Sequence, residues 1–356
     1  MSGNRRLGNA PSNYGQVVAA ALSGRETHRP ATGPLAVHFC AAFAGVSLRD
    51  YSLDAKVLAD CVVHYWERFQ PDAVWLSADT WVTAEAMGAA VDFPGDNQPL
   101  CGVGKPPVRS ANDIEQIPPP NPDTQGRWPL MLDALRRIRR NLAGKAFVVA
   151  CFDQYPFSLA CALMGLENVM IQLSDDPTLV HMLMDKCSQY TIAYALALGR
   201  TGADMLSGGD SPAGLLGPEL YRKIALPYER RVIDALHSHL HLPVSLHICG
   251  NAEPILVDMV QSRADVLELD HKVDMAIACR ITGPDIAIWG NLDPVGLLVQ
   301  STPEQVRKAT VSLLKTVDTC RHRRFVLSSG CTLAPDTPVV NLQAMFEAAS
   351  NPGAEL

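Results

Sequence analysis

Three residues in the second half of the chain have side chains that bind transition metals. His247 and Cys249 lie two positions apart in the run Leu246–Asn251, and Cys331 follows in the run Ser328–Thr332. Alternate side chains of a β-strand point to the same face, so His247 and Cys249 on one strand can reach one metal ion. These three residues are therefore the predicted metal ligands.

One imidazole and two thiolates form a ligand set that suits zinc. Three protein ligands leave a fourth coordination position for a substrate, which is typical of a catalytic zinc rather than a structural one. Any one of these residues alone would be read as a packing residue, because cysteine is among the most buried residue types. Their coincidence at the ends of two predicted strands favours the metal site.

Short apolar runs recur along the chain, and most are followed by a segment of helical periodicity. The predicted strands are Leu35–Phe39, Ala73–Ser77, Ala146–Cys151, Asp204–Ser207, Val244–Cys249, Val266–Leu269, Ile286–Trp289 and Phe325–Ser328. The predicted helices include Ala55–Phe69, Trp128–Leu142, Asp176–Thr201, Pro218–Leu240, Pro254–Gln261, Pro303–Thr319 and Val339–Ala349. This alternation predicts an α/β fold, a (β/α)8 TIM barrel, with its site at the carboxyl ends of the strands.

We expect residues 1–356 to form a single barrel domain with two additions. Residues 1–33 are predicted to be an N-terminal extension, and residues 80–128 an insertion or cap between the second and third strands. Nine of the 26 prolines lie in Pro94–Pro129, so this part should be irregular. An open nucleotide-binding sheet is disfavoured, because the chain has neither Gly-x-Gly-x-x-Gly after its first strand nor a phosphate-binding Gly-x-x-x-x-Gly-Lys-Ser/Thr motif.

The composition excludes some classes of partner. Lys and Arg number 30 against 37 Asp and Glu, which gives a formal charge of −7 and argues against nucleic acid. No run of 18 apolar residues occurs and Met1–Pro11 has no apolar core, so we expect no membrane segment and a cytoplasmic location. The ten cysteines are then mostly thiols. An oligomer is possible, but surface helices do not reveal it.

Further polar residues are expected at the same end of the barrel. Asp210 follows the fourth strand and is a candidate fourth ligand, partner of His247 or proton acceptor. With Asn291 after the seventh strand and His38 on the first, it forms the set of candidate catalytic residues, although a role in turns is the alternative for Asp210 and Asn291. The candidates for cofactor binding are Asp153, Tyr155, Asp270 and His271, and Asp79 is a further pocket candidate.

Several motifs resemble a known family. They are His247–Asn251, Trp289–Pro294, Thr302–Val306, Gly330-Cys331 with Thr337-Pro338, and the shorter Ala20–Gly24, Glu85–Gly88 and Gly209–Pro212. Together they resemble the uroporphyrinogen decarboxylase superfamily over nearly the whole chain. More closely, they resemble its zinc-containing, cobalamin-dependent methyltransferase branch.

The resemblance implies that a methyl group moves between a corrinoid (cobalamin) and a small substrate. The corrinoid is usually carried by a separate corrinoid protein, and the substrate would be a thiol such as coenzyme M or a methylated alcohol, ether or amine. Zinc would lower the pKa of a substrate thiol, or act as a Lewis acid on the heteroatom of a methyl donor. The ligands do not determine the direction of transfer.

Two other functions are open. A metal-free porphyrinogen decarboxylase binds a polycarboxylate and typically carries an Arg-Gln-Ala-Gly-Arg-like stretch after the first strand, whereas His38–Gly45 has no arginine. The third alternative is a non-catalytic protein that binds a metal or a corrinoid. The Asp-x-His-x-x-Gly motif of a cobalamin-carrying domain does not occur in the chain, so a corrinoid would have to come from outside.

Overall fold

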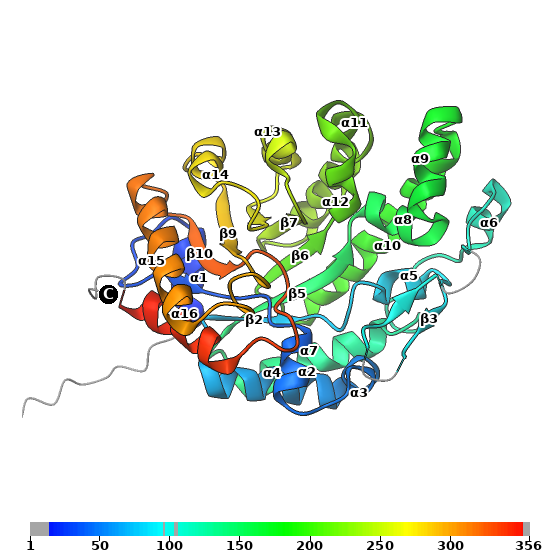
Figure 1. Ribbon diagram of the computed structural model, residues 1–356. Helices are drawn as coiled ribbons and strands as arrows, with labels where there is room; N and C mark the ends of the chain where they lie inside the picture. The colour runs from blue at the N-terminus through cyan, green and yellow to red at the C-terminus, as the bar shows by residue number, and fades with distance from the viewer. Residues whose placement is uncertain (1–13, 95–96, 103–105, 352–356) are drawn as a thin grey trace, which may run out of the picture.

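Eight parallel strands curve into a nearly closed barrel in the computed structural model, which describes residues 14–94, 97–102 and 106–351 (Figure 1). Around the barrel the strand order is β1-β10-β9-β8-β7-β6-β5-β2. The strands are β1 Ala31–Thr32, β2 Ala73–Leu76, β5 Phe147–Gln154, β6 Met205–Gly209, β7 Val244–Ile248, β8 Val266–Leu269, β9 Ala287–Leu292 and β10 Phe325–Ser329. The predicted TIM barrel is confirmed.

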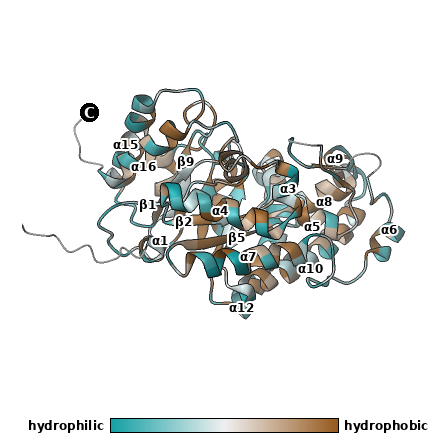
Figure 2. Ribbon diagram, turned by 90° about the horizontal axis from the view of Figure 1, so that it is seen from below, coloured by the Kyte–Doolittle hydropathy of each residue, from teal (hydrophilic) through white to brown (hydrophobic). Residues whose placement is uncertain are grey.

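Each strand is followed by a helix on the outside of the barrel. These helices are α4 Ala55–Phe69, α7 Trp128–Leu142, α10 Thr178–Thr201, α12 Leu226–His239, α13 Leu256–Met259, α14 Met275–Thr282, α15 Pro303–Thr319 and α16 Val339–Ser350. In Figure 2, β5 is brown while α4 and α7 alternate between brown and teal, as expected for helices that bury one face. No single described helix is long and apolar enough to cross a membrane. Helices α8 (Pro156–Met164) and α9 (Leu166–Asp175) have the necessary length and apolar composition only when they are counted together, and the chain bends by 105° between them.

The interior of the barrel is apolar at its amino end. Trp75 and Trp289 meet edge to face with ring centroids 5.8 Å apart, and Phe147 and Met205 are buried in the same cluster. Helix α1 (Tyr14–Leu22) packs its apolar face against this cluster. Polar chemistry inside the barrel is thereby restricted to the carboxyl ends of the strands.

Side chains bridge the seam between β1 and β2, where the described residues form no backbone ladder. Asp72 accepts hydrogen bonds from the backbone N–H and the hydroxyl of Thr32 at 2.9 and 3.0 Å. The same carboxylate accepts two from the Arg29 guanidinium at 2.6 and 2.7 Å. The barrel therefore closes through a buried ion pair at this seam.

The predicted first strand, Leu35–Phe39, is wrong. The pairing with β10 involves Ala31 and Thr32, and His38 begins the short helix α2 (His38–Phe43). Pro34 has no N–H for a ladder, and Gly33 lies against the indole of Trp289, where a Cβ would overlap the ring. The barrel thus begins inside the segment 1–33 that was predicted to be an extension.

Two other predictions need correction or detail. The predicted helix Pro218–Leu240 is divided at Ala225 into α11 (Gly217–Ile224) and α12, because Pro227 cannot continue the hydrogen bonding of α11. The predicted insertion contains α5 (Val82–Ala86), the antiparallel ribbon of β3 (Val91–Asp92) and β4 (Leu100–Cys101), and α6 (Ala111–Gln116). As predicted, its described part adds no further strand to the barrel.

Candidate metal centre

The three predicted ligands come together at the carboxyl end of the barrel. His247 Nε2 lies 3.0 Å from the Sγ of Cys249, which lies 3.6 Å from the Sγ of Cys331. All three ligand atoms lie within 4.8 Å of one another. Two sulfurs at about 2.3 Å from a tetrahedral zinc would be about 3.8 Å apart, so this donor set fits zinc.

The orientation of the His247 imidazole is set by the neighbouring strand. Its Nδ1 lies 3.0 Å from the backbone carbonyl oxygen of Glu268, which is paired with His247 in the register of β7 and β8. An Nδ1–H that donates to this carbonyl leaves the Nε2 lone pair directed at the two sulfurs. The imidazole is thus held in the tautomer that a metal ligand needs.

Cys331 reaches the site because Gly330 allows a close approach of two backbones. The N–H of Gly330 donates to the carbonyl of Leu292 at 2.7 Å. A Cβ at this position would lie 3.0 Å from the carbonyl carbon of Asp270 and would overlap the backbone nitrogen of His271. The chain after β10 therefore lies directly against the loop after β8, and this contact places Cys331 beside Cys249.

The three ligands perturb one another's proton affinity. A hydrogen bond from Cys331 lowers the pKa of Cys249, and the Ser211 hydroxyl acts in the same direction. The same hydrogen bond, together with burial, raises the pKa of Cys331 to about 12. Burial lowers the pKa of His247, but Cys331 and Glu268 raise it by more, to about 9. A metal ion that binds here therefore displaces protons from the ligands.

Asp210 lies behind the metal ligands. Its backbone N–H donates to the carbonyl of His247 at 2.8 Å, while its Oδ1 accepts from the N–H and hydroxyl of Ser158 at 2.7 and 2.6 Å. Burial raises the pKa of Asp210 to about 6. These contacts hold the strand that carries His247, and a catalytic role for Asp210 stays a prediction.

The other two candidate catalytic residues make local contacts. The Asn291 amide donates to the carbonyls of Asp270 and Val273 at 3.1 and 2.9 Å, so it holds the loop after β8. His38 Nε2 lies 2.8 Å from the carbonyl of Ala78, and burial lowers the pKa of His38. Its imidazole is therefore uncharged at neutral pH.

Asp270 and His271 lie next to the metal ligands. Asp270 accepts from the backbone N–H of Gly250 at 2.9 Å, which anchors the turn directly after Cys249. His271 Nδ1 lies 3.0 Å from the other oxygen of Asp270. Asp270 thus positions the loop that carries one of the sulfur ligands.

Asp153 and Tyr155 lie on the side of the barrel formed by β2 and β5. The Tyr155 hydroxyl donates to the carbonyl of Ser245 at 2.8 Å, so it spans the interior. One carboxylate oxygen of Asp153 accepts from the N–H and hydroxyl of Thr83, both at 2.9 Å, and the other has no partner among the described residues. Burial and the charge of Asp79 raise the pKa of Asp153 to about 8.

Sequence reasoning missed two buried charged residues at this end. Arg127 is paired with Asp79 at 2.5 Å and with Glu85 at 2.6 Å. Glu268 lies inside the barrel below His247 and accepts from the hydroxyls of Ser207, at 2.7 Å, and Ser245. The presence of a glutamate within the apolar strand Val266–Leu269 is a signal from which Glu268 could have been found. Nothing in the sequence around Arg127, which precedes the amphipathic helix α7, indicates that its side chain is buried.

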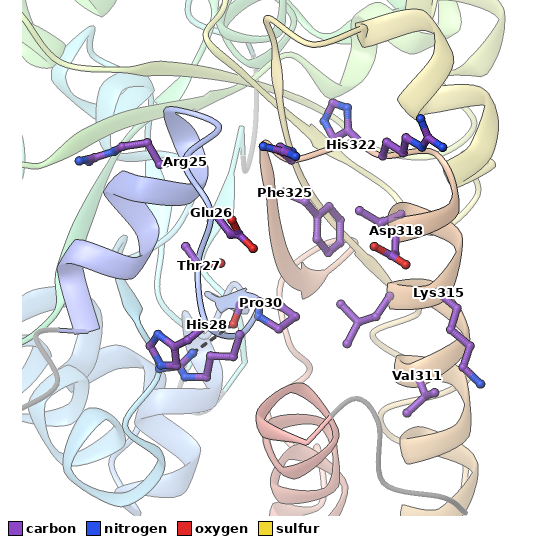
Figure 3. A pocket seen from close by; sticks show the side chains of 15 residues that line it. Arg25, Glu26, Thr27, His28, Pro30, Val311, Lys315, Asp318, His322 and Phe325 are labelled. Atoms are coloured by element: carbon purple, nitrogen blue, oxygen red, sulfur yellow. Dashed lines mark hydrogen bonds between the residues drawn. The ribbon is translucent and has the colours of Figure 1, made fainter. Parts of the chain in front are cut away.

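A separate pocket lies at the opposite end of the barrel. It has a volume of about 770 Å³ and is bordered by the segment Arg25–Pro30 and by α15. In Figure 3 the ring of Phe325, the first residue of β10, lies between that segment and the helix. Cys331 follows the other end of the same strand, so this pocket is not part of the metal site.

Comparison with known proteins places this geometry in a family. The family described as Uroporphyrinogen decarboxylase (URO-D) matches residues 15–352. A methylcobamide:CoM methyltransferase, MtbA of Methanosarcina mazei, is 34% identical over 284 residues, covering 79% of this chain and 80% of that protein. A uroporphyrinogen decarboxylase of Prochlorococcus marinus is 30% identical over 312 residues, covering 86% and 85%.

The fold has a close structural counterpart. A methyltransferase structure from Methanosarcina mazei matches with a TM-score of 0.86 at 22% sequence identity, covering 96% of this chain and 99% of that one. The barrel and these matches define an enzyme family. The chain belongs to the uroporphyrinogen decarboxylase (URO-D) family, whose members similar to it include both methyltransferases and decarboxylases.

Proposed function

We propose that this protein is a zinc-dependent methyltransferase that moves a methyl group between a corrinoid and a small substrate. The observation that carries the proposal is the convergence of His247, Cys249 and Cys331 within 4.8 Å at the carboxyl end of the barrel. A metal-free decarboxylase has no need of this donor set. Similarity to methylcobamide:CoM methyltransferases supports the same activity.

His247, Cys249 and Cys331 would hold the zinc and leave one coordination position for the substrate. Zinc bound there lowers the pKa of a thiol or polarises the heteroatom of a methyl donor. The protein's own contribution is orientation: the carbonyl of Glu268 holds the His247 ring, and Asp270 holds the Gly250 N–H beside Cys249. Because these side chains are already held in position, the site does not have to rearrange during the reaction.

The corrinoid would come from a separate protein or from solution, because the chain has no Asp-x-His-x-x-Gly motif to ligate cobalt. The carboxyl end of the barrel is where such a donor or acceptor would dock, since the metal ligands lie there. A corrinoid, free or carried by a separate protein, is therefore the co-substrate that the proposed function requires.

The first experiment is elemental analysis of the protein purified without added metal. We expect about one zinc per chain in the parent, and little in His247→Ala, Cys249→Ala and Cys331→Ala, because each variant removes a ligand. Cys320→Ala, which changes an exposed cysteine outside the site, is the matched control and should keep its zinc. Circular dichroism would show that the barrel still folds in each variant.

Activity would then separate the candidate functions. We expect methyl transfer between cobalamin and a small substrate in the parent and its loss in Cys331→Ala. A second candidate is uroporphyrinogen decarboxylation, which the relative at 30% identity favours. Decarboxylation by a zinc-free protein would support that candidate, and zinc binding without either activity would support a non-catalytic metal-binding protein.

A further inference from the structure

We propose that the mouth of this barrel selects a cationic or uncharged small substrate and discriminates against anionic ones. The inference rests on the proposed function, because it concerns the molecule that would reach the metal. It is carried by the charged side chains around the carboxyl ends of the strands, where carboxylates outnumber cations and the buried cation is already paired.

The first group of charges lies after β2. The guanidinium of Arg127, which is 6% exposed, is 2.5 and 3.1 Å from the two carboxylate oxygens of Asp79. Its Nε donates to Glu85 at 2.6 Å. Two carboxylates thus neutralise one guanidinium, so this group keeps a net negative charge and Arg127 has no free edge for a substrate anion.

Asp153 adds a third carboxyl on the neighbouring strand. β2 and β5 pair in parallel with Leu76 opposite Ala150, so Asp79 and Asp153 each lie three residues beyond the same pair. Asp153 has a φ of 68°, in the region that favours glycine, and its Oδ1 has no partner among the described residues. An unsatisfied carboxyl oxygen in a constrained backbone is a common feature of functional sites.

The metal side of the mouth is also acidic. Glu268 is 2% exposed inside the barrel, and Asp270 is buried beside the turn after Cys249. Zinc bound by two thiolates and an imidazole adds no net charge, and the buried His38 is neutral because burial lowers its pKa. Arg49 and Lys272 are exposed outside this group, and Arg49 donates to the carbonyl of Phe93 at 3.1 Å.

The charges therefore do not balance. The carboxylates counted around the mouth are Asp79, Glu85 and Asp270, against the single guanidinium of Arg127. Asp153, whose pKa is raised to about 8, is mostly protonated at neutral pH, and burial also raises the pKa of Glu268, so neither is counted as a charge. In the low dielectric of a partly buried site, this excess repels a sulfonate or carboxylate and attracts an ammonium group. Aminothiols and methylated amines carry the positive charge that this negative potential attracts, whereas anionic thiols carry the charge that it repels.

Binding of three thiols of similar size tests the inference without turnover. The probes are 2-mercaptoethylamine (cationic), 2-mercaptoethanol (uncharged) and 2-mercaptoethanesulfonate (anionic). Their dissociation constants would be measured from the sulfur-to-metal absorption band of the cobalt(II)-substituted protein. The variants are Glu85→Gln and Asp79→Asn, each of which removes one partner of Arg127, with Asp318→Asn, an exposed acid on α15, as a control of equal charge change. The ratio of the dissociation constants of the cationic and anionic thiols is compared between variants. Each thiol has the same pKa whichever variant it binds, so differences in thiol acidity cancel in this comparison.

We expect the parent to bind the cationic thiol more tightly than the anionic one. Each mouth variant should lower this cation-to-anion ratio by roughly fivefold or more, and Asp318→Asn should leave it unchanged. Tighter binding of the sulfonate by the parent, or an equal ratio in mouth variants and control, would overturn the inference. Two variants are used because either one alone could disturb folding, which circular dichroism would reveal.

Turnover distinguishes the two proposals. Methyl transfer from methylcobalamin with the sulfonate as the best acceptor would reject charge selection and keep the proposed function. Ordered binding of the three thiols with no methyl transfer to any of them would reject transfer to a thiol and keep charge selection. If no thiol perturbs the metal spectrum, both proposals fail for thiols.

Discussion

At the scale of single residues, the geometry of the candidate metal centre depends on a glycine that is not itself one of the candidate ligands. Gly330 has no side chain, and this lets the backbone before Cys331 touch the backbone of Asp270 and His271. The two sulfur ligands come from strands that are not neighbours in the sheet, so their 3.6 Å separation depends on this contact. The position of Cys331 is therefore set by the packing of two main-chain segments and not by contacts of the cysteine side chain.

We predict that Gly330→Ala loses most of its zinc. The added methyl group would force the loop after β10 away from the loop after β8, and overpacking of this kind typically costs roughly 1–3 kcal/mol of folding free energy. The measurements are zinc content and urea unfolding.

Gly283→Ala is the control for this prediction. Gly283 also needs a special backbone, with φ of 62°, but a Cβ there meets no other atom within 4 Å. This variant should be destabilised by roughly 1–3 kcal/mol, because its backbone lies in a region that is essentially restricted to glycine, and it should keep its zinc. Full zinc content in Gly330→Ala would contradict the importance of the close approach.

At the scale of elements, a buried pair of carboxyl groups joins the helices behind the metal site. Asp210 precedes the short helix η1 (Ser211–Leu215), and Glu229 lies on α12 and accepts from the Tyr221 hydroxyl at 2.5 Å. Each carboxyl group has one buried oxygen with no hydrogen-bond partner among the described residues, and burial raises the pKa of both. One proton shared between the two groups would satisfy both oxygens.

We predict that this pair makes the protein less stable as the pH rises. A carboxyl group whose pKa is higher in the folded chain stabilises the fold below its ordinary pKa of 3.8, and that stability is lost as the pH passes its folded value of about 6 for Asp210. Glu229→Gln keeps a hydrogen-bond donor and removes one charge. Urea unfolding at pH 5 and pH 8 should show the parent losing on the order of 2 kcal/mol more than the variant.

The same comparison can reject the shared proton. Asp153 also has a raised pKa, but it is present in both proteins and cancels in the difference. Parallel pH profiles for the parent and Glu229→Gln would mean that Asp210 and Glu229 do not hold a proton together.

At the scale of the whole molecule, the barrel closes through side chains at one seam. Asp72 is fully buried between β1 and β2 and is held by Arg29 and Thr32. The seam lies at the amino end of the barrel and the metal ligands at the carboxyl end. Closure of the barrel and the candidate metal site therefore involve separate residues.

We predict that Asp72→Ala destabilises the fold without removing zinc. The variant leaves Arg29 without its partner at a partly buried position, and loss of one partner of a buried pair costs roughly 3–5 kcal/mol. Urea unfolding and zinc content are the measurements. Asp60→Ala, in the exposed pair with Lys56, should change stability far less. Zinc loss in Asp72→Ala while the barrel is still folded would show that the two ends are coupled.

Short-range periodicity was enough to predict the barrel and to put His247 and Cys249 forward together as candidate metal ligands. Strands and helices alternate within windows of a few residues, and His247 and Cys249 share a face because a strand repeats every two residues. The same local logic failed at the first strand. There the outcome depends on Gly33 and Trp289, which are 256 positions apart and are joined by a 2.7 Å hydrogen bond.

The pairing of buried charges, in contrast, depends on contacts between residues that are far apart in the sequence. Arg127 is buried against Asp79, which lies 48 positions away in the sequence. Nothing in a local window marks such a pair, because closure of the barrel and folding of the insertion bring the two residues together. The acidic mouth, and with it the proposed choice of substrate, follows from these long-range pairings rather than from any motif.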